Sequence, residues 1–439
     1  MESNNNLGVL ERRFKLSEHG TRTKTEIIAG ITTFMTMAYI LVVNPIILSA
    51  TGMDKGAILT ATALSAAIAT ILMAFLANLP FALAPGMGLN AFFAFTVVIE
   101  MGYSWQFALT AVLIEGIIFI LLTFLKVREA IVNSMPDVIK NAVSVGIGLF
   151  IAFIGFQSAG IIVNDESVLL TLGNMKDPSV VIALAGLVIT GILLIRRVKG
   201  ALLIGMLITT VLAIVVGQAT LPTAVVSAPP SLKPIFWKFV GWEEILSWDM
   251  LIVVFTFLFV DLFDTLGTFI GVSTKAGLLD EKGNVPNIGK ALFSDAVGTT
   301  VGAMLGTSTV TTYVESASGV AEGGRTGLTA LTTGILFLIS MIFAPILTAI
   351  PGIATAPILI LVGSFMMSPI LRINFDDFTE AIPAFLTIII MPLAYSIAEG
   401  LVFGIVYYVL LKLLSGKGRD VHIVMYIIAA LFIIKEIVA

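Results

Sequence analysis

About fourteen apolar stretches, each long enough to cross a bilayer, follow one another along the chain. A membrane-spanning helix needs about 20 mainly apolar residues. In lipid every backbone N–H and C=O must be satisfied within the protein, which leaves only helices and closed barrels. Hydrophobic residues make up 58% of the chain and charged residues 12%, whereas soluble domains carry about a quarter charged residues. The sequence therefore predicts an all-α polytopic membrane protein.

Charged residues and Gly/Pro positions separate the predicted segments. These are residues 27–49, 57–78, 80–101, 105–125, 137–158, 178–195, 200–219, 249–270, 288–306, 307–322, 326–348, 354–370, 380–397 and 399–415. A further apolar stretch, 422–437, is short and flanked by charge, so it could span the membrane, lie at its interface or pack against the bundle.

The distribution of basic residues predicts the orientation. Five precede the first segment: Arg12, Arg13, Lys15, Arg22 and Lys24. If the sides alternate from a cytoplasmic start, the outer side receives only four lysines: Lys55, Lys176, Lys233 and Lys238. By the positive-inside rule we expect a multi-pass protein of the cytoplasmic membrane with its N-terminus in the cytoplasm.

Two carboxylates, Asp261 and Asp264, interrupt the apolar stretch 255–271. An ionised Asp at mid-membrane is unfavourable unless it is paired or wetted, so it indicates function. At i, i+3 spacing both side chains lie on nearly the same helix face. In the alternative interpretation, one Asp only bonds Thr265, Thr268 or a neighbouring helix.

Two interrupted segments, 79–90 and 306–319, are third and tenth in order, which is the same position in each half of a seven-plus-seven repeat. An odd number of spans per repeat inverts the second copy. Both read as half extended and half helical, so we expect short antiparallel strands in segments 3 and 10, with Asn90 near a helix N-cap. Two merely kinked helices are the alternative.

The stretch 255–271 and the two interrupted segments are expected to place Asp261, Asp264, Glu315 and Asn90 at a similar depth in the membrane. Carboxylates accept hydrogen bonds, often two at a time, so the site suits a flat neutral heterocycle with several N–H groups and repels anions. Four aromatic residues near them in sequence could stack on such a ring, and the pattern assigns none of them: Phe92, Phe93, Phe263 and Tyr313. A shielded carboxylate can carry a proton, which favours proton coupling; sodium held by Asp264 remains open.

Four blocks resemble the AzgA-like purine permeases, the hypoxanthine, guanine and adenine branch of the nucleobase transporters related to uracil permease. They are TTFMTMAYI at 32–40 with Asn44-Pro45, APGMGLNAFF at 84–93, DLFDTLG at 261–267 and TYVESASGVAEGGRTG at 312–327. The resemblance extends from about residue 12 to residue 420. It implies fourteen spans in a 7+7 inverted repeat, proton symport of a purine nucleobase and a homodimer.

The resemblance also implies a division of the chain. The expected parts are a tail (1–26), a core domain of spans 1–4 (27–126) and 8–11 (249–349), a gate domain of spans 5–7 (127–220) and 12–14 (350–416), an extracellular loop (221–248) and a C-terminal segment (417–439).

By the same resemblance, Asp261, Glu315 and Asn90 correspond to substrate-binding residues, and Gly88 and Thr312 lie in the same blocks as further candidates. Asp264 corresponds to a second acid of span 8 linked to transport. The expected proton-coupling residues are therefore Asp264, Asp261 and Glu315. Uracil-type relatives have a His where this chain has Thr265.

Two other classes of function were weighed. An anion exchanger or channel of the same fold would want Ser, Arg or helix N-termini in place of Asp261 and Glu315. An enzyme would need a nucleophile with its base, a metal-ligand cluster or a nucleotide loop, and the sequence suggests none. We therefore expect no catalytic or metal-binding residue, no cofactor and no nucleic-acid partner, only a small substrate and the bilayer.

Overall fold

A computed structural model describes residues 8–125, 136–222, 224–278 and 285–438. Each of the fourteen predicted segments corresponds there to a helix or to a strand followed by a helix. Within these ranges, nine helices are long and apolar enough to cross a membrane, and the other segments are shorter or interrupted. Residues 1–7 of the expected tail and the core–gate junction at 126–135 lie outside the described residues.

The segments expected in the core pack with one another: α6 contacts α12 and α13, α4 contacts α13 and α15, and α2 contacts α14 and α15. Their bounds are α2 (Thr23–Met37), α3 (Ile40–Ser49), α4 (Lys55–Leu72), η1 (Met73–Ala77), β1 (Leu83–Pro85), α5 (Met87–Ala91), η2 (Phe92–Glu100), α6 (Trp105–Leu125), α12 (Trp248–Ala276), α13 (Ile288–Leu305), β4 (Val310–Thr312), α14 (Ser316–Ala321), α15 (Gly327–Ser340), η3 (Met341–Phe343) and α16 (Ala344–Ala349).

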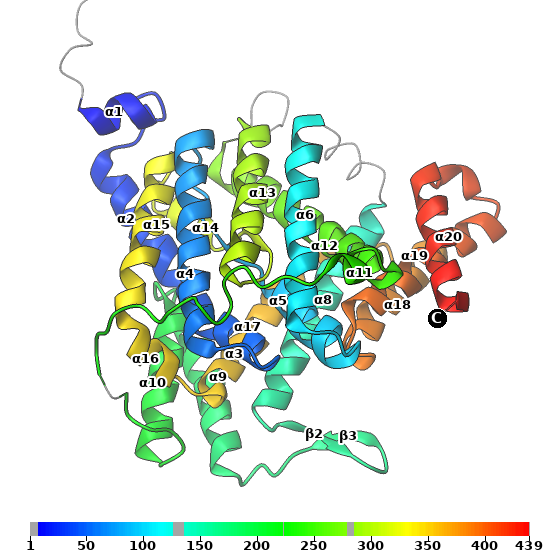
Figure 1. The fold of residues 1–439 in the computed structure, drawn as a ribbon, viewed down its shortest axis with the longest axis horizontal. Helices are drawn as coiled ribbons and strands as arrows, with labels where there is room; N and C mark the ends of the chain where they lie inside the picture. The colour runs from blue at the N-terminus through cyan, green and yellow to red at the C-terminus, as the bar shows by residue number, and fades with distance from the viewer. Residues whose placement is uncertain (1–7, 126–135, 223, 279–284, 439) are drawn as a thin grey trace, which may run out of the picture.

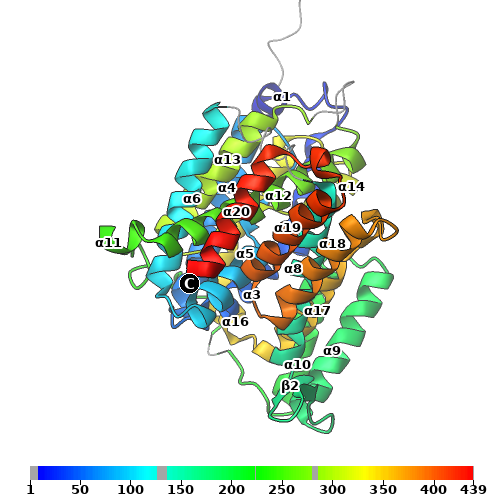
Figure 2. The ribbon, with the colours of Figure 1, turned by 90° about the vertical axis from the view of Figure 1, so that its right-hand side faces the viewer.

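The segments expected in the gate form a second group, in which α8 contacts α17 and α18, α18 contacts α19, and α9 contacts α10 and α17. Their bounds are α8 (Asp137–Ser158), α9 (Pro178–Ile195), α10 (Ala201–Val215), α17 (Gly352–Phe365), η4 (Ser368–Arg372), α18 (Phe378–Leu393) and α19 (Ile397–Leu414). The two groups occupy different sides of the molecule (Figures 1 and 2).

The predicted strands pair at the centre of the first group. β1 and β4 are antiparallel, with Leu83 opposite Thr312 and Pro85 opposite Val310. The Thr70 hydroxyl lies 2.9 Å from the Leu83 nitrogen, and the Thr299 hydroxyl donates to the Val310 carbonyl at 2.8 Å. Neighbouring helices thus satisfy the edges of this ribbon, which is the condition for extended backbone at membrane depth.

The structure differs from the sequence prediction after β1. The helix begins at Met87, with Gly86 as its N-cap, so Asn90 lies inside the first turn and not at the cap. Pro85 is the last residue of β1, and Gly88 is the second residue of α5. Phe92 to Glu100 then continues as a π-helix, a form often found near functional sites.

Three peripheral features complete the fold. A hairpin of β2 (Ile162–Asp165) and β3 (Leu169–Leu172), which was not predicted, joins α8 to α9. The C-terminal stretch forms α20 (Ile423–Val438), which packs against α19. The tail helix α1 (Val9–Phe14) lies beside α2 at the top of Figure 1. The other short elements are α11 (Trp242–Ile245) and η5 (Gly418–Asp420).

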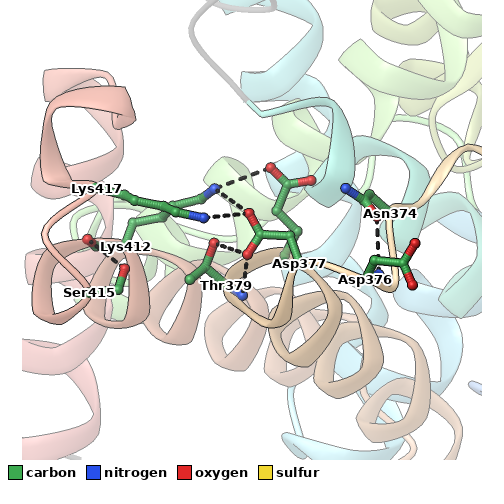
Figure 3. A network of polar contacts seen from close by, with 8 residues as sticks. Asn374, Asp376, Asp377, Thr379, Lys412, Ser415 and Lys417 are labelled. Carbon is green, nitrogen blue, oxygen red and sulfur yellow. Dashed lines mark hydrogen bonds and ion pairs between the residues drawn. The ribbon is translucent and has the colours of Figure 1, made fainter.

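An ion-pair network joins α18 to α19 (Figure 3). Lys412, whose side chain is only 5% exposed, lies 3.2 Å from Glu380 and 3.8 Å from Asp377. Lys417 contacts Asp377 at 2.7 Å. The Asp377 carboxylate also caps α18 by accepting from the Thr379 amide at 2.9 Å. These charges therefore fix the start of α18 against the end of α19.

Candidate functional site

The first predicted span is broken at Ala38 and Tyr39, between α2 and α3, and this break faces α14. The Tyr39 hydroxyl donates to Glu315 Oε1 at 2.7 Å. Glu315 is the N-cap residue of α14 and follows β4 closely. One turn further on, the Ser318 hydroxyl lies 2.9 Å from that of Thr36. The break and the strand–helix junction thus place a tyrosine and a carboxylate together.

Asp264 lies at the same place, on α12. Asp264 is close enough to Asp261 and Glu315 for the three carboxylates to interact electrostatically. Tyr39 is likewise close to both Asp264 and Glu315. A Cβ added at Gly86 would stand 3.8 Å from Asp264 Oδ2, so the β1–α5 turn also approaches this carboxylate. Elements of both repeats therefore meet around Asp264 and Glu315.

The face of α12 that carries Asp264 is open. Asp264 is partly exposed, and Gly267 and Gly271, three and seven residues further along, are exposed with open space at their Cβ positions. This spacing puts all three on one helix face. Because an ionised carboxylate facing lipid is unfavourable, we expect this face of α12 to look into protein or water.

Asp261 is fully buried on the side of α12 that faces α13 and β4. The hydroxyl of Thr265 lies 3.0 Å from Asp261 Oδ1, 3.3 Å from Asp295 Oδ1 and 2.6 Å from the Thr311 hydroxyl. Asp295 belongs to α13 and is also fully buried. The structure therefore brings two carboxylates around one hydroxyl, next to the Asp264 and Glu315 pair.

The other predicted site residues have different surroundings. The side chain of Asn90 accepts from the Ser308 hydroxyl and lies 3.4 Å from the Pro85 carbonyl, so it holds the two interrupted segments together. A Cβ on Gly88 would stand 2.6 Å from Ile147 of α8, so this glycine allows α5 to pack closely on the second helix group. The buried Thr312 hydroxyl has no hydrogen-bond partner among the described residues.

The candidate aromatic residues mostly pack within the protein. Phe92 meets Phe257 edge to face, with ring centroids 4.8 Å apart. Phe93 is fully buried, and the Tyr313 hydroxyl donates to the Pro85 carbonyl. The side chain of Phe263 lies outside the described part of the structure.

The electrostatics of the site are acidic. Within the described residues, neither Asp264 nor Glu315 forms an ion pair with a lysine, arginine or histidine. Glu115 on α6 accepts from Thr309, just before β4, at 2.6 Å. The described residues of the site therefore offer hydrogen-bond acceptors to a ligand and no fixed positive charge to an anion.

Sequence reasoning missed Tyr39, Asp295 and Thr311 as members of this region. Tyr39 is the last residue but one of the block TTFMTMAYI, and a lone tyrosine in the middle of an apolar segment was the available signal. Asp295 lies in the predicted span 288–306, where a single acid near the span end gives no signal of its own. Thr311 reaches the site only because β4 pairs with β1.

The chain is similar to known permeases over nearly its whole length. The model of the permease family matches residues 24–403. Guanine/hypoxanthine permease PbuG of Bacillus subtilis is 47% identical over 431 residues, covering 96% of this chain and 98% of that protein. Adenine permease AdeP of Escherichia coli is 44% identical over 431 residues, covering 98% of this chain and 96% of that protein.

Solved structures share the fold. The transmembrane domain of the cyanobacterial bicarbonate transporter BicA aligns with a TM-score of 0.64 over 87% of this chain and 97% of that domain. The two sequences are only 16% identical, so this likeness concerns the fold alone. It confirms the predicted 7+7 inverted repeat with short strands in segments 3 and 10.

Proposed function

The chain belongs to the permease family, and on that premise we propose that it imports purine nucleobases, namely hypoxanthine, guanine or adenine, by alternating access. The names of its relatives PbuG and AdeP support this substrate class. The observation that carries the proposal is the meeting of two acids from the second half of the chain, Asp264 and Glu315, with Tyr39 from the first half, whose hydroxyl lies 2.7 Å from Glu315.

Substrate binding is assigned to Asp264 and Glu315. A purine presents ring N–H and amino donors around a flat ring, and a carboxylate can accept two of them at once. Tyr39 orients Glu315, while the unbonded Thr312 hydroxyl is a candidate further contact. Asn90 and Gly88, which were expected to bind substrate, also hold β1–α5 against β4 and α8.

Proton coupling is assigned to Asp261 together with Asp295. Two buried carboxylates around the Thr265 hydroxyl repel each other when both are ionised, so the pair favours holding one proton. Asp264 lies next to Asp261 on the same helix, and its charge responds to that of Asp261. A proton on the pair therefore makes the neighbouring site less negative and couples proton uptake to substrate binding.

The moving parts are assigned from the packing. The first helix group, with α2 to α6 and α12 to α16, is the core that carries the site, and the second, with α8 to α10 and α17 to α19, is the gate. Gly88 against Ile147 lies at a contact between them, where a small residue allows two rigid parts to move closely past each other. We assign the tail to the cytoplasm, the protein to the plasma membrane and the functional unit to a homodimer.

The anion-transport alternative has little support at the site. BicA shares the fold but is only 16% identical in sequence, so the likeness gives no information about the substrate of this chain. Carboxylates without a paired cation at Asp264 and Glu315 oppose an anionic substrate.

Two measurements on three variants test the proposal. We expect Asp264→Asn, Glu315→Gln and Asp261→Asn each to abolish accumulation of labelled hypoxanthine while still reaching the membrane. Purified Asp261→Asn should still bind hypoxanthine, whereas the other two should not, and the exposed control Asp376→Asn should behave as wild type. Binding retained by Glu315→Gln would contradict the substrate assignment.

Coupling is tested separately in cells that express the wild-type protein. A protonophore should collapse accumulation, and uptake should rise as the external pH falls. If uptake were insensitive to the protonophore and required sodium, the coupling ion would be sodium and not the proton.

A further inference from the structure

A cavity of about 310 Å³ lies where the N-terminal tail meets the loop between α14 and α15. The tail is held there by its own contacts. Phe14 and Leu16 are buried against Ala74 and Leu328, and the Asn78 side chain donates to the Phe14 carbonyl at 3.1 Å. The cavity is therefore a part of the folded molecule, remote from the acidic site around Glu315.

Its walls are polar and basic, and none of the lining residues is acidic. They are His19, Gly20, Thr21, Arg22, Thr25, Gly323 and Arg325. The Thr21 hydroxyl contacts the Gly323 carbonyl at 3.4 Å, which joins the two sides of the cavity.

Among the described residues, no carboxylate forms an ion pair with the two arginines of the cavity. The Arg325 guanidinium instead donates to the carbonyls of Val320 and Gly324, both at 2.7 Å. Two nearby acids are already engaged, since Glu18 pairs with Lys15 at 3.0 Å and Glu322 pairs with Lys199 at 2.8 Å.

The remaining nearby acid, Glu26, is fully buried and directed at the backbone. It accepts from the Arg325 amide at 2.8 Å, the Thr329 amide at 3.1 Å and the Thr329 hydroxyl at 2.6 Å. These bonds fix the loop that carries Arg325, and the basic residues that line the cavity are Arg22, Arg325 and His19.

We propose that this cavity binds a phosphate group. Guanidinium groups bind phosphate oxygens through paired, charge-assisted hydrogen bonds, and the Thr25 hydroxyl can add a further donor. The volume is at the lower end of the range for small-molecule sites, so it suits a phosphate with one small substituent. Such a phosphate can come from a soluble phosphorylated metabolite or from the headgroup of an anionic lipid.

The site lies beside a contact between the two helix groups. Glu322, next to Gly323 of the cavity wall, pairs with Lys199, which precedes α10 of the second group. A phosphate bound in the cavity would therefore act next to the Lys199–Glu322 ion pair, which joins the core to the gate. The binding itself does not depend on the proposed substrate.

The soluble source is tested with the purified full chain in detergent. Inorganic phosphate and adenosine monophosphate are titrated at constant ionic strength while thermal unfolding is followed by tryptophan fluorescence. We expect both to raise the melting temperature in a saturable way, and Arg22→Gln to weaken the apparent affinity about tenfold. Lys24→Gln, an exposed charge loss two residues away that does not line the cavity, should leave the affinity unchanged.

The lipid source is tested with the same three proteins in nanodiscs of phosphatidylcholine, with and without phosphatidic acid. Stabilisation by phosphatidic acid that requires Arg22 but not Lys24, without a response to soluble phosphate, assigns the site to a lipid headgroup. An Arg22-dependent response to soluble phosphate assigns it to a metabolite. If neither probe stabilises the protein, or if Arg22→Gln and Lys24→Gln respond alike, the proposal is wrong.

Discussion

Two groups of carboxylates in this molecule have opposite surroundings. Asp377 and Glu380, at the start of α18, each have a lysine within 3.2 Å (Figure 3). Asp264 and Glu315 have none within the described residues, and Glu315 is contacted instead by the Tyr39 hydroxyl. Each group consists of one Asp and one Glu, so the difference comes from their partners and their exposure and not from their residue types.

The contrast separates structural from functional acids. A carboxylate with a lysine partner is neutralised, holds two helices in place and has little left to offer a ligand. A carboxylate surrounded by hydroxyls keeps unsatisfied acceptor capacity, which a purine or a proton can use. A mid-membrane acid is therefore informative about function only once its partners are known.

The largest expected effect compares Glu315→Gln with Glu380→Gln. The first should lower the initial rate of hypoxanthine uptake by about 100-fold or more, because a site built to accept hydrogen bonds is left mismatched. The second should change the rate less than about twofold, since its pair lies at a partly exposed surface. Rates are corrected for the amount of protein in the membrane. Equal losses in both variants would remove the contrast.

Next in size is Lys412→Met, which leaves Asp377 and Glu380 without their buried partner. We expect a lower melting temperature, equivalent to roughly 2 kcal/mol, which is less than the about 3–5 kcal/mol for a fully buried pair because both carboxylates are partly exposed. Uptake per folded molecule should stay within about twofold of wild type. The control, Lys417→Met, removes an exposed lysine and should destabilise less. A transport defect in Lys412→Met at normal stability would give this network a functional role.

Tyr39→Phe should have an intermediate effect. The variant removes one hydrogen bond to Glu315 and preserves the ring, so uptake should fall about five- to tenfold. Tyr407→Phe, on an exposed face of α19, is the matched control and should behave as wild type. An unchanged rate in Tyr39→Phe would show that Glu315 does not depend on this contact.

The smallest effect concerns pH. The Lys417 ammonium, with the Thr379 bonds, holds the pKa of Asp377 well below its usual range, and the Asp377 carboxylate raises the pKa of Lys417. A lowered acid pKa adds stability above the unfolded value of about 4 that is lost only as pH falls through the folded value. A raised lysine pKa adds stability that is lost only well above about 10.

The stability difference between wild type and Asp377→Asn should therefore be the same at pH 5 and pH 8, measured by thermal unfolding. Uptake by the wild type should change over that interval, because the proposed proton-binding pair lies elsewhere. If the stability difference between wild type and Asp377→Asn varied between pH 5 and pH 8, Asp377 and Lys417 would not both stay charged over that interval.

Much of the fold was predictable because the bilayer restricts the choices. Apolar length located all fourteen segments, and Gly/Pro interruptions at the third and tenth positions located β1 and β4. The β2–β3 hairpin was missed because it lies between membrane segments, where that restriction does not apply. The start of α5 was misplaced because the helix was expected to begin near Asn90, whereas it begins at Met87, directly after Gly86.

The candidate site was predictable in its residue types and less so in its arrangement. Asp261 and Asp264 are separated by three residues, which puts them about 60° apart around a helix. That small angle was treated as one face. In the structure it is enough to turn Asp261 towards Asp295 and Thr311 while Asp264 turns towards Glu315.

The sequence alone determined that this chain is a polytopic inverted-repeat permease with acids in the middle of its spans, because hydropathy, charge bias and interrupted segments are local properties that a bilayer reads directly. Only the tertiary structure decided which acid meets which partner. Those contacts join Tyr39, β4, α12 and α13 across the chain, and they depend on helix rotations that no local pattern records.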